Sequence, residues 1–209
     1  MVESRISTGV EGLDRVLGGG FPKGSLIVIT GNPGTGKTVF SARFLYRGVV
    51  DYGENGVYVN FAENRESFYE NMGHLGFDFE RLEKEDKFRY LGMLAVRESA
   101  VSSILKMILE EINKIKAKRL VIDSFSAIAQ AFKRPHDARI LIHTVLDRIV
   151  RKAGCTTLMV IEIPFGEKRT GLGMEEFIAD GFIHLRAGRL EERLFRDMAI
   201  RKMRGTVLK

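Results

Sequence analysis

Residues 31–38 read Gly-Asn-Pro-Gly-Thr-Gly-Lys-Thr, and this stretch decides how the rest of the 209-residue chain is interpreted. It matches the Walker A pattern in full, and it lies between a predicted strand over 26–30 and a helix predicted from Gly36 to about Tyr52. Glycines let successive backbone N–H groups turn toward an anion, and a helix N-terminus adds positive potential. The stretch therefore predicts a cradle for nucleotide phosphates, not a glycine turn without a ligand.

The expected ligand of the cradle is ATP with Mg²⁺. The Lys37 ammonium would reach the outer phosphates and take part in catalysis, and the Thr38 hydroxyl is suited to bind Mg²⁺. GTP stays open, because the sequence lacks a guanine-reading Asn-Lys-x-Asp segment but has no motif that identifies adenine. The predicted nucleotide contacts are Gly31, Asn32, Pro33, Gly34, Thr35, Gly36, Lys37, Thr38 and Val39.

A carboxylate opposite Thr38 is needed to complete a magnesium site, and Asp123 is the candidate. It ends the apolar run 120–122, and ligands of open α/β sheets lie at the carboxyl ends of strands. An acid in this position can also cap a helix or a turn. Given the cradle, we predict that Asp123 holds Mg²⁺ together with Thr38.

Two further acids follow predicted strands. Glu63 comes after the strand 57–61 and is the candidate base that orients the attacking water; the alternative is that it stabilises the N-terminus of the helix predicted from Arg65. Glu162, near the end of the strand 157–163, is a candidate catalytic sensor or an ordinary strand-end acid.

Apolar periodicity along the remaining chain predicts alternating strands and helices. Strands are expected over 26–30, 57–61, 87–91, 120–122 and 157–163, helices over 36–52, 65–75, 102–115 and 136–153, and two or three later strands before Arg204. This alternation predicts an α/β fold with a mostly parallel twisted sheet, helices on both faces and C-terminal β strands. Since no linker or repeat divides the sequence, we expect one domain over residues 1–209.

Composition places the chain among ordinary globular proteins, with 44% hydrophobic and 29% charged residues. No apolar run reaches the roughly eighteen residues of a membrane span, and the start Met-Val-Glu-Ser-Arg does not have the layout of a signal peptide. We therefore expect a cytoplasmic protein with no membrane partner. Cys155 has no second cysteine to pair with and is interpreted as a packing residue.

Basic residues are concentrated at the C-terminal end. Residues 186–209 contain eight Lys or Arg against Glu191, Glu192 and Asp197, a local balance of +5. Such a cluster can neutralise phosphates of nucleic acid or nucleotide, or it can be a solvated strand face.

The segment 164–176 has neither helical nor strand periodicity and is expected to be a mobile loop, functional or merely a surface excursion. Its Lys168 and Arg169, together with the basic C-terminal segment, make DNA a candidate partner. Because Phe165 is the one aromatic residue within this loop, only sequence-independent binding is expected.

Segments on both sides of the cradle resemble a known family. Residues 6–14 read Ile-Ser-Thr-Gly-Val-Glu-Gly-Leu-Asp, 17–25 read Leu-Gly-Gly-Gly-Phe-Pro-Lys-Gly-Ser, 120–124 read Leu-Val-Ile-Asp-Ser, 175–181 read Glu-Glu-Phe-Ile-Ala-Asp-Gly and 201–205 read Arg-Lys-Met-Arg-Gly. Over nearly the whole chain this sequence resembles KaiC-like ATPases of the RecA superfamily. Single-domain archaeal RecA paralogues of the RadC type look like the nearest group.

The resemblance implies a RecA-like P-loop NTPase core that hydrolyses ATP and assembles with itself, as a ring that is usually a hexamer or as a filament, with ATP between subunits. Lys202 and Arg204 match the family's Lys-x-Arg motif, which reaches the γ-phosphate of the neighbouring subunit and assists catalysis. The RadC type is associated with DNA binding and with control of recombination or repair.

This sequence departs from the family in several places. Relatives commonly have Phe-Glu-Glu where this chain has Phe61, Ala62 and Glu63, so we expect slow turnover, and the alternative is a nucleotide-gated regulator or scaffold with little hydrolysis. KaiC itself has two such domains in tandem, and nothing in this sequence indicates a clock or an autokinase. The chain ends soon after Arg204, where relatives usually continue, which leaves open a truncated or a short family member.

Overall fold

The computed structural model describes residues 4–93, 97–132, 135–164, 178–190 and 193–207, and every structural statement below refers to these residues. The loop expected over 164–176, with Phe165, Lys168 and Arg169, lies outside the described residues except for Pro164.

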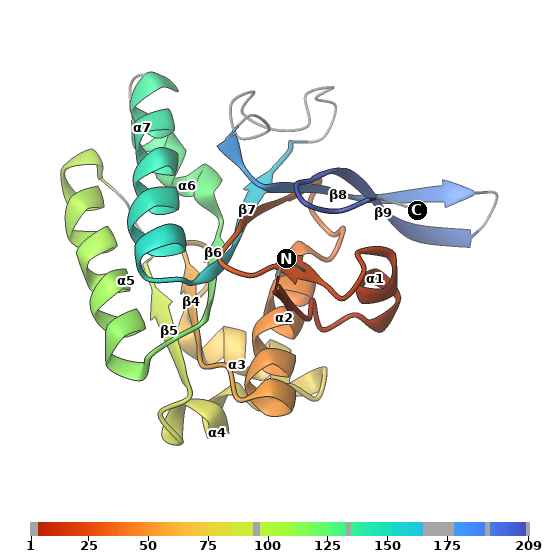
Figure 1. The fold of residues 1–209 in the computed structure, drawn as a ribbon, viewed down its shortest axis with the longest axis horizontal. Helices are drawn as coiled ribbons and strands as arrows, with labels where there is room; N and C mark the ends of the chain where they lie inside the picture. The colour runs from red at the N-terminus through yellow and green to blue at the C-terminus, as the bar shows by residue number, and fades with distance from the viewer. Residues whose placement is uncertain (1–3, 94–96, 133–134, 165–177, 191–192, 208–209) are drawn as a thin grey trace.

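One mixed sheet of seven strands organises the molecule (Figure 1). Across the sheet the strands follow the order β5 (Phe88–Gly92), β4 (Gly56–Asn60), β6 (Arg119–Asp123), β7 (Thr156–Glu162), β3 (Leu26–Gly31), β8 (Gly181–Leu190) and β9 (Arg193–Met203). All neighbours from β5 to β8 are parallel, whereas β8 and β9 form an antiparallel hairpin that projects beyond the helices. The prediction of a mostly parallel sheet with C-terminal strands is confirmed.

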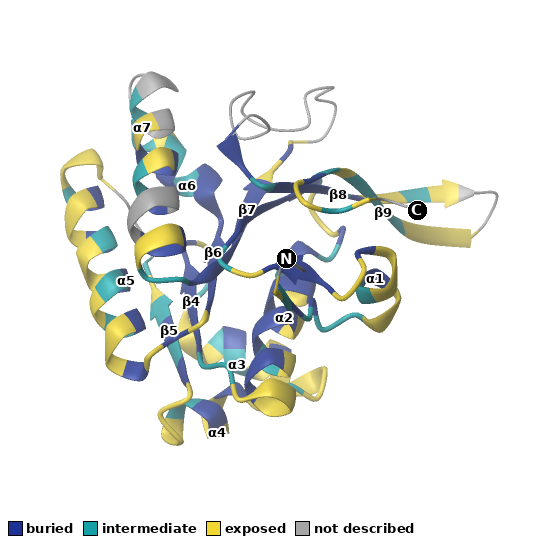
Figure 2. Ribbon diagram, viewed as in Figure 1, coloured by how far each residue is buried: buried dark blue, intermediate teal, exposed yellow. Residues whose placement is uncertain are grey.

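Helices cover both faces of the sheet, because successive side chains of the buried strands point to opposite sides. One apolar core joins the sheet to α5 (Val101–Ile115), α6 (Phe125–Gln130), α7 (Pro135–Val145) and the π-helical turn η2 (Leu146–Lys152). The other joins it to α1 (Glu11–Val16), α2 (Lys37–Tyr52), α3 (Arg65–His74) and α4 (Phe79–Lys84). In Figure 2 the strands between these layers are buried along most of their length, whereas the helices expose their outer sides.

Several elements differ from the sequence-based expectation. The helix expected over 136–153 is α7 followed by η2; Val145, Ile149 and Val150 stay buried through the wider turn, so the apolar pattern does not reveal the change. Three helices of six residues, α1, α4 and α6, were not predicted, because fewer than two turns give no repeating apolar period. The same holds for the 3-10 turn η1 (Glu98–Ala100) and for the two-residue strands β1 (Arg5–Ile6) and β2 (Phe21–Pro22).

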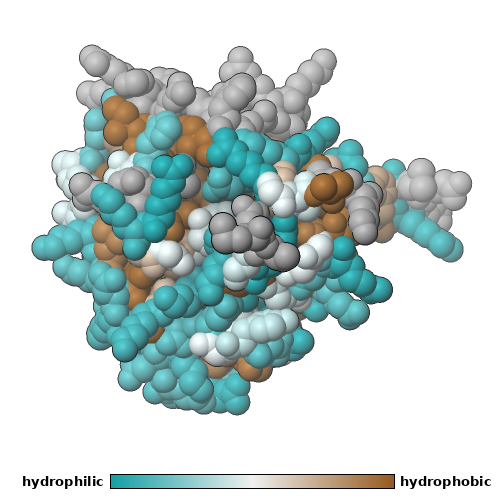
Figure 3. Space-filling model, viewed as in Figure 1, coloured by the Kyte–Doolittle hydropathy of each residue, from teal (hydrophilic) through white to brown (hydrophobic). Residues whose placement is uncertain are grey.

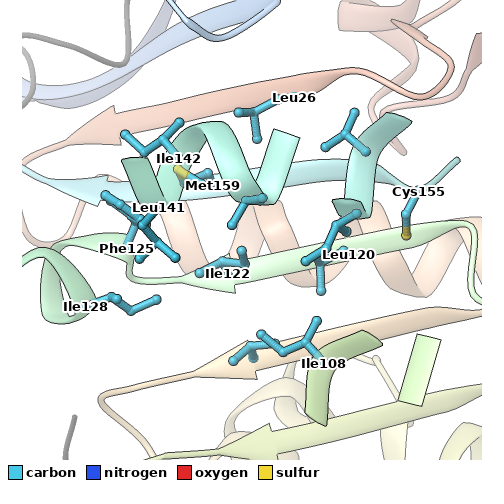
Figure 4. Close-up of a cluster of buried hydrophobic side chains, with 14 of the residues drawn as sticks. Leu26, Ile108, Leu120, Ile122, Phe125, Ile128, Leu141, Ile142, Cys155 and Met159 are labelled. Atoms are coloured by element: carbon cyan, nitrogen blue, oxygen red, sulfur yellow. The ribbon is translucent and has the colours of Figure 1, made fainter. Parts of the chain in front are cut away.

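Cys155 is a packing residue, as predicted. It belongs to the core between the sheet and α5 to α7, where Leu120 and Ile108 also lie (Figure 4). Burial raises the pKa of its thiol to about 12, so the side chain is a neutral thiol at physiological pH.

The outer surface is mostly hydrophilic on the face shown in Figure 3. Hydrophobic side chains show there between α5 and α7, where a groove of about 720 Å³ is lined by residues that include Leu105, Leu109 and Ile140. Among the described helices, none combines the length and the apolar character that a membrane span requires.

Candidate nucleotide-binding site

The loop between β3 and α2 has the backbone shape that its glycines predict. Gly36, at the N-cap of α2, has φ +95°, a left-handed conformation that favours glycine. At Gly31 a Cβ atom would lie 2.4 Å from the carbonyl oxygen of Leu185, so a side chain cannot be accommodated. The first turn of α2 has no acidic residue, and its first N–H groups have no carbonyl partner within the helix. This end of α2 is therefore suited to bind an anion.

Lys37 lies folded over the same loop. Its ammonium group donates hydrogen bonds of 2.9 Å to the carbonyl oxygens of Gly31 and Asn32. Burial lowers the pKa of Lys37, while the negative charges of Glu162 and Asp123 act in the opposite direction. The structure thus places the positive charge inside the cradle, beside two of the three predicted acids.

The other residues of the loop divide into anchoring and exposed positions. The Asn32 amide donates to the carbonyl oxygens of Ile163 (3.0 Å) and Pro164 (3.2 Å), and the buried Thr35 hydroxyl donates to the carbonyl of Asn32 (2.9 Å). The Asn32 contacts tie the loop to the residues that follow β7, and the Thr35 contact is internal to the loop. Pro33, Gly34 and Val39 are exposed, Val39 to 40%.

The predicted metal residues Thr38 and Asp123 are in direct contact. The Thr38 hydroxyl donates to Asp123 Oδ2 at 2.8 Å, and the buried Tyr58 hydroxyl donates to the same oxygen at 2.7 Å. Burial raises the pKa of Asp123. The hydrogen bonds from Tyr58 and Thr38 oppose that rise, and so does the positive charge of Lys37. A hydroxyl and a carboxylate are oxygen ligands of the kind that Mg²⁺ prefers, so this pair fits the ion.

Glu63 lies in the turn after β4, at the same edge of the sheet as Asp123. The two strands are in register, with Asn60 opposite Asp123, and the Phe61 N–H donates to the Asp123 carbonyl at 2.8 Å. The Glu63 carboxylate accepts a hydrogen bond of 2.5 Å from the Asn71 amide. Asn64, not Glu63, caps α3, because its side chain accepts a bond of 2.9 Å from the Ser67 N–H. Glu63 directly precedes this cap, so the alternative that its charge stabilises the N-terminus of α3 stays open.

Glu162 ends β7 directly opposite Gly31 in the parallel pairing of β7 with β3. Its backbone N–H donates to the Ser126 hydroxyl at 2.9 Å, and its side chain is exposed. Since its charge acts on Lys37, the structure brings Glu162 to the cradle as expected, while its role as a sensor stays a prediction.

Arg204 lies at the opposite end of β3 from the cradle, whereas Lys202 pairs with Phe182, which lies opposite Val28 in the middle of β3. The Arg204 N–H donates to the Asp180 carbonyl (2.8 Å), and the Asp180 N–H donates to the carbonyl of Leu26, the first residue of β3 (2.9 Å). Gly31 lies beside Leu185, which pairs with Met198, and the six steps from Met198 to Arg204 span roughly 20 Å along a strand. Within one subunit Arg204 is therefore far from the cradle, and Lys202 is two residues closer to it.

Four residues of the site had not been identified from the sequence: Tyr58, Asn60, Asn71 and Ser126. Tyr58 and Asn60 carry a faint signal, because each is a polar group in an otherwise apolar strand next to Glu63. Asn71 and Ser126 lie on helices, and only the packing of those helices brings them to the site.

The site and the fold have counterparts in known proteins. A sequence model of the family described as "ATPase: KaiC" matches residues 6–209. A UPF0273 protein of Methanocaldococcus jannaschii is 35% identical, with 97% of this chain and 88% of that protein covered. The circadian clock oscillator protein KaiC of Prochlorococcus marinus is 33% identical over 99% of this chain, which spans 42% of that longer protein.

A solved structure gives the same result in three dimensions. The crystal structure of a KaiC-like protein of Pyrococcus horikoshii superimposes with a TM-score of 0.87 at 37% identity, covering 99% of this chain and 91% of the other. Sequence and fold agree over nearly the whole length, and the chain belongs to the KaiC-like ATPase family of the RecA superfamily.

Proposed function

We propose that this protein binds Mg²⁺ and ATP in the loop of residues 31–38 and hydrolyses ATP slowly, at a site that a second copy of the chain completes. The observation that carries the proposal is the contact of Thr38 with Asp123 at 2.8 Å, directly beside the buried Lys37. A hydroxyl, a carboxylate and an ammonium group at a helix N-terminus together suit a magnesium-bound triphosphate.

Each residue would have a defined task. The N–H groups at the start of α2 would hold the phosphates, and Lys37 would exchange its bonds to the loop carbonyls for bonds to phosphate oxygens. Thr38 and Asp123 would hold Mg²⁺, which when bound supplies positive charge to the β- and γ-phosphate oxygens. Glu63 would orient a water molecule and accept its proton as the water attacks the γ-phosphate. With Ala62 beside it, Glu63 acts without a second acid, which is the reason to expect slow turnover.

The position of the basic pair supports completion of the site by a second subunit. Arg204 is separated from its own cradle by the length of β3, and Lys202 by about half of that length, so the pair would act on the phosphates of another copy. Charge spreads over the phosphoryl oxygens in the transition state, and an arginine placed against them stabilises it. Turnover should therefore rise with assembly, as a ring or a filament.

Mixing two inactive variants tests this proposal. Lys37→Ala removes the positive charge of the cradle and keeps the basic pair. Arg204→Ala keeps the cradle and removes one member of the basic pair, so each variant alone should be inactive. In an equal random mixture about one quarter of the interfaces combine an intact cradle with an intact Arg204, and turnover should return to that fraction. No recovery would contradict catalysis across the interface, and no turnover by the wild type at any protein concentration would refute the ATPase proposal.

A second candidate function is sequence-independent DNA binding by the β8–β9 hairpin. Exposed arginines at positions 186, 189, 193 and 196 favour it, although Arg186 is paired with Asp197 at 2.6 Å. Affinity for single- and double-stranded DNA should fall steeply as salt increases, and the absence of binding at low salt, with and without ATP, would exclude this function.

A further inference from the structure

The carboxylate of Glu63, the base of the proposed function, is held by a residue outside the cradle. Asn71 lies on α3, and its amide nitrogen donates a hydrogen bond of 2.5 Å to Glu63 Oε1. The Asn71 side chain is exposed, so it is accessible from outside the subunit. The bond therefore directs one oxygen of the Glu63 carboxylate toward α3.

The backbone around Glu63 is held by separate contacts. Asn60 Oδ1 accepts bonds from the N–H groups of Ala62 (2.8 Å) and Glu63 (3.1 Å), and the Tyr90 hydroxyl donates to the Glu63 carbonyl at 2.7 Å. Because these bonds hold the turn without using the carboxylate, the Glu63 side chain can rotate while its backbone stays in place. The bond to Asn71 therefore decides where the carboxylate points, not how the turn folds.

We propose that Asn71 is a positioning residue: its hydrogen bond keeps the Glu63 carboxylate from orienting the attacking water. ATP turnover is therefore restrained until this hydrogen bond is broken. This inference rests on the proposed function. It assigns to the exposed side of α3 a regulatory role, since any contact that draws the Asn71 amide away frees the base. It also assigns part of the slow turnover to Asn71, in addition to the absence of a second acid at Ala62.

Asn71→Ala should raise kcat for ATP by about threefold to tenfold, which is the change expected when one hydrogen bond of ordinary net strength is removed from the ground state. KM should not change, because the cradle is untouched. Glu70→Ala, at the adjacent exposed position of α3, is the matched control and should behave as the wild type. The gain should vanish when Asn71→Ala is combined with Glu63→Gln, since a general structural effect would not depend on Glu63.

An unchanged or lower kcat in Asn71→Ala, or a gain that persists in the double variant, would overturn the inference. A readout without turnover keeps the test separate from the proposed function. When Mg²⁺ and a non-hydrolysable ATP analogue are added, the Asn71 side-chain amide resonances in the NMR spectrum should shift in the wild type and much less in Glu63→Gln. Equal shifts in both proteins, or none in a wild type whose binding of the analogue is shown by calorimetry, would refute the role of Asn71 even if the protein hydrolyses no ATP.

Discussion

The hydroxyl of Thr38 donates a 2.8 Å hydrogen bond to the carboxylate of Asp123, joining the first turn of α2 to the end of β6. The two residues are 85 positions apart, and the parallel sheet brings both to the same edge. This contact is the centre of the proposed magnesium site, and it gives the first prediction.

Replacement of Asp123 by Asn should separate binding from stability. The amide keeps the shape of the carboxylate but lacks its charge, so the affinity for ATP in the presence of Mg²⁺ should fall by at least about tenfold. Burial raises the pKa of Asp123, which means that its ionised form is disfavoured in the folded protein; the free energy of unfolding should therefore not decrease. Calorimetric titration and chemical denaturation measure the two effects. Thr38→Ser, which retains a hydroxyl, is the control, and wild-type affinity in Asp123→Asn would argue against the site.

Replacement of Arg119 by Ala should destabilise the fold by about 3 kcal/mol. The buried Arg119 guanidinium donates to the carbonyls of Ser7 (2.8 Å) and Phe44 (2.7 Å) and to the Glu54 carboxylate (2.6 Å), and it lies 4.5 Å from the centre of the Phe44 ring. Its loss leaves these acceptors without their donor and leaves a cavity beneath α2. Denaturant unfolding measures the change. The exposed neighbour Lys118→Ala should change stability by no more than about 0.5 kcal/mol, and equal effects of the two changes would be the contrary result.

Acidification should destabilise the protein through His184. Its Nδ1 lies 3.0 Å from the Thr30 hydroxyl. Burial is the main cause that lowers the pKa of His184; the positive charges of Arg201 and Arg186 lower it further, and the negative charge of Asp197 raises it. Protonation is therefore less favourable in the folded than in the unfolded chain. The stabilisation is complete above the unfolded pKa of about 6.5 and is lost as pH falls from that value through the lower folded pKa.

The measurement is the Tm between about pH 7.5 and pH 5.5. The wild type should lose stability over this range more steeply than His184→Gln. His74→Gln, at an exposed position of α3, should keep the wild-type slope, and an unaltered slope in His184→Gln would show that another group is responsible.

The strands and long helices could be predicted because their signals are local. The apolar stripe of α5 and the buried runs of β3, β6 and β7 each fill one continuous stretch of sequence, and the predicted bounds agree with the structure within a residue or two. The six-residue helices α1, α4 and α6 could not be predicted, because so short a segment has too few turns to show a period. The break from α7 into η2 was missed because the apolar side stays buried across it.

By itself, the sequence determined the cradle, the identity of its lysine and threonine, and the acid that ends β6, because a phosphate-binding loop is encoded in consecutive residues between a strand and a helix. Only the tertiary structure decided which distant groups meet there. Strand register and helix packing decide three of these meetings: the hydrogen bond of Tyr58 to Asp123, the hydrogen bond of Asn71 to Glu63, and the placement of Arg204 at the far end of β3. These arise from contacts between residues far apart in the chain, which no local pattern of residues specifies.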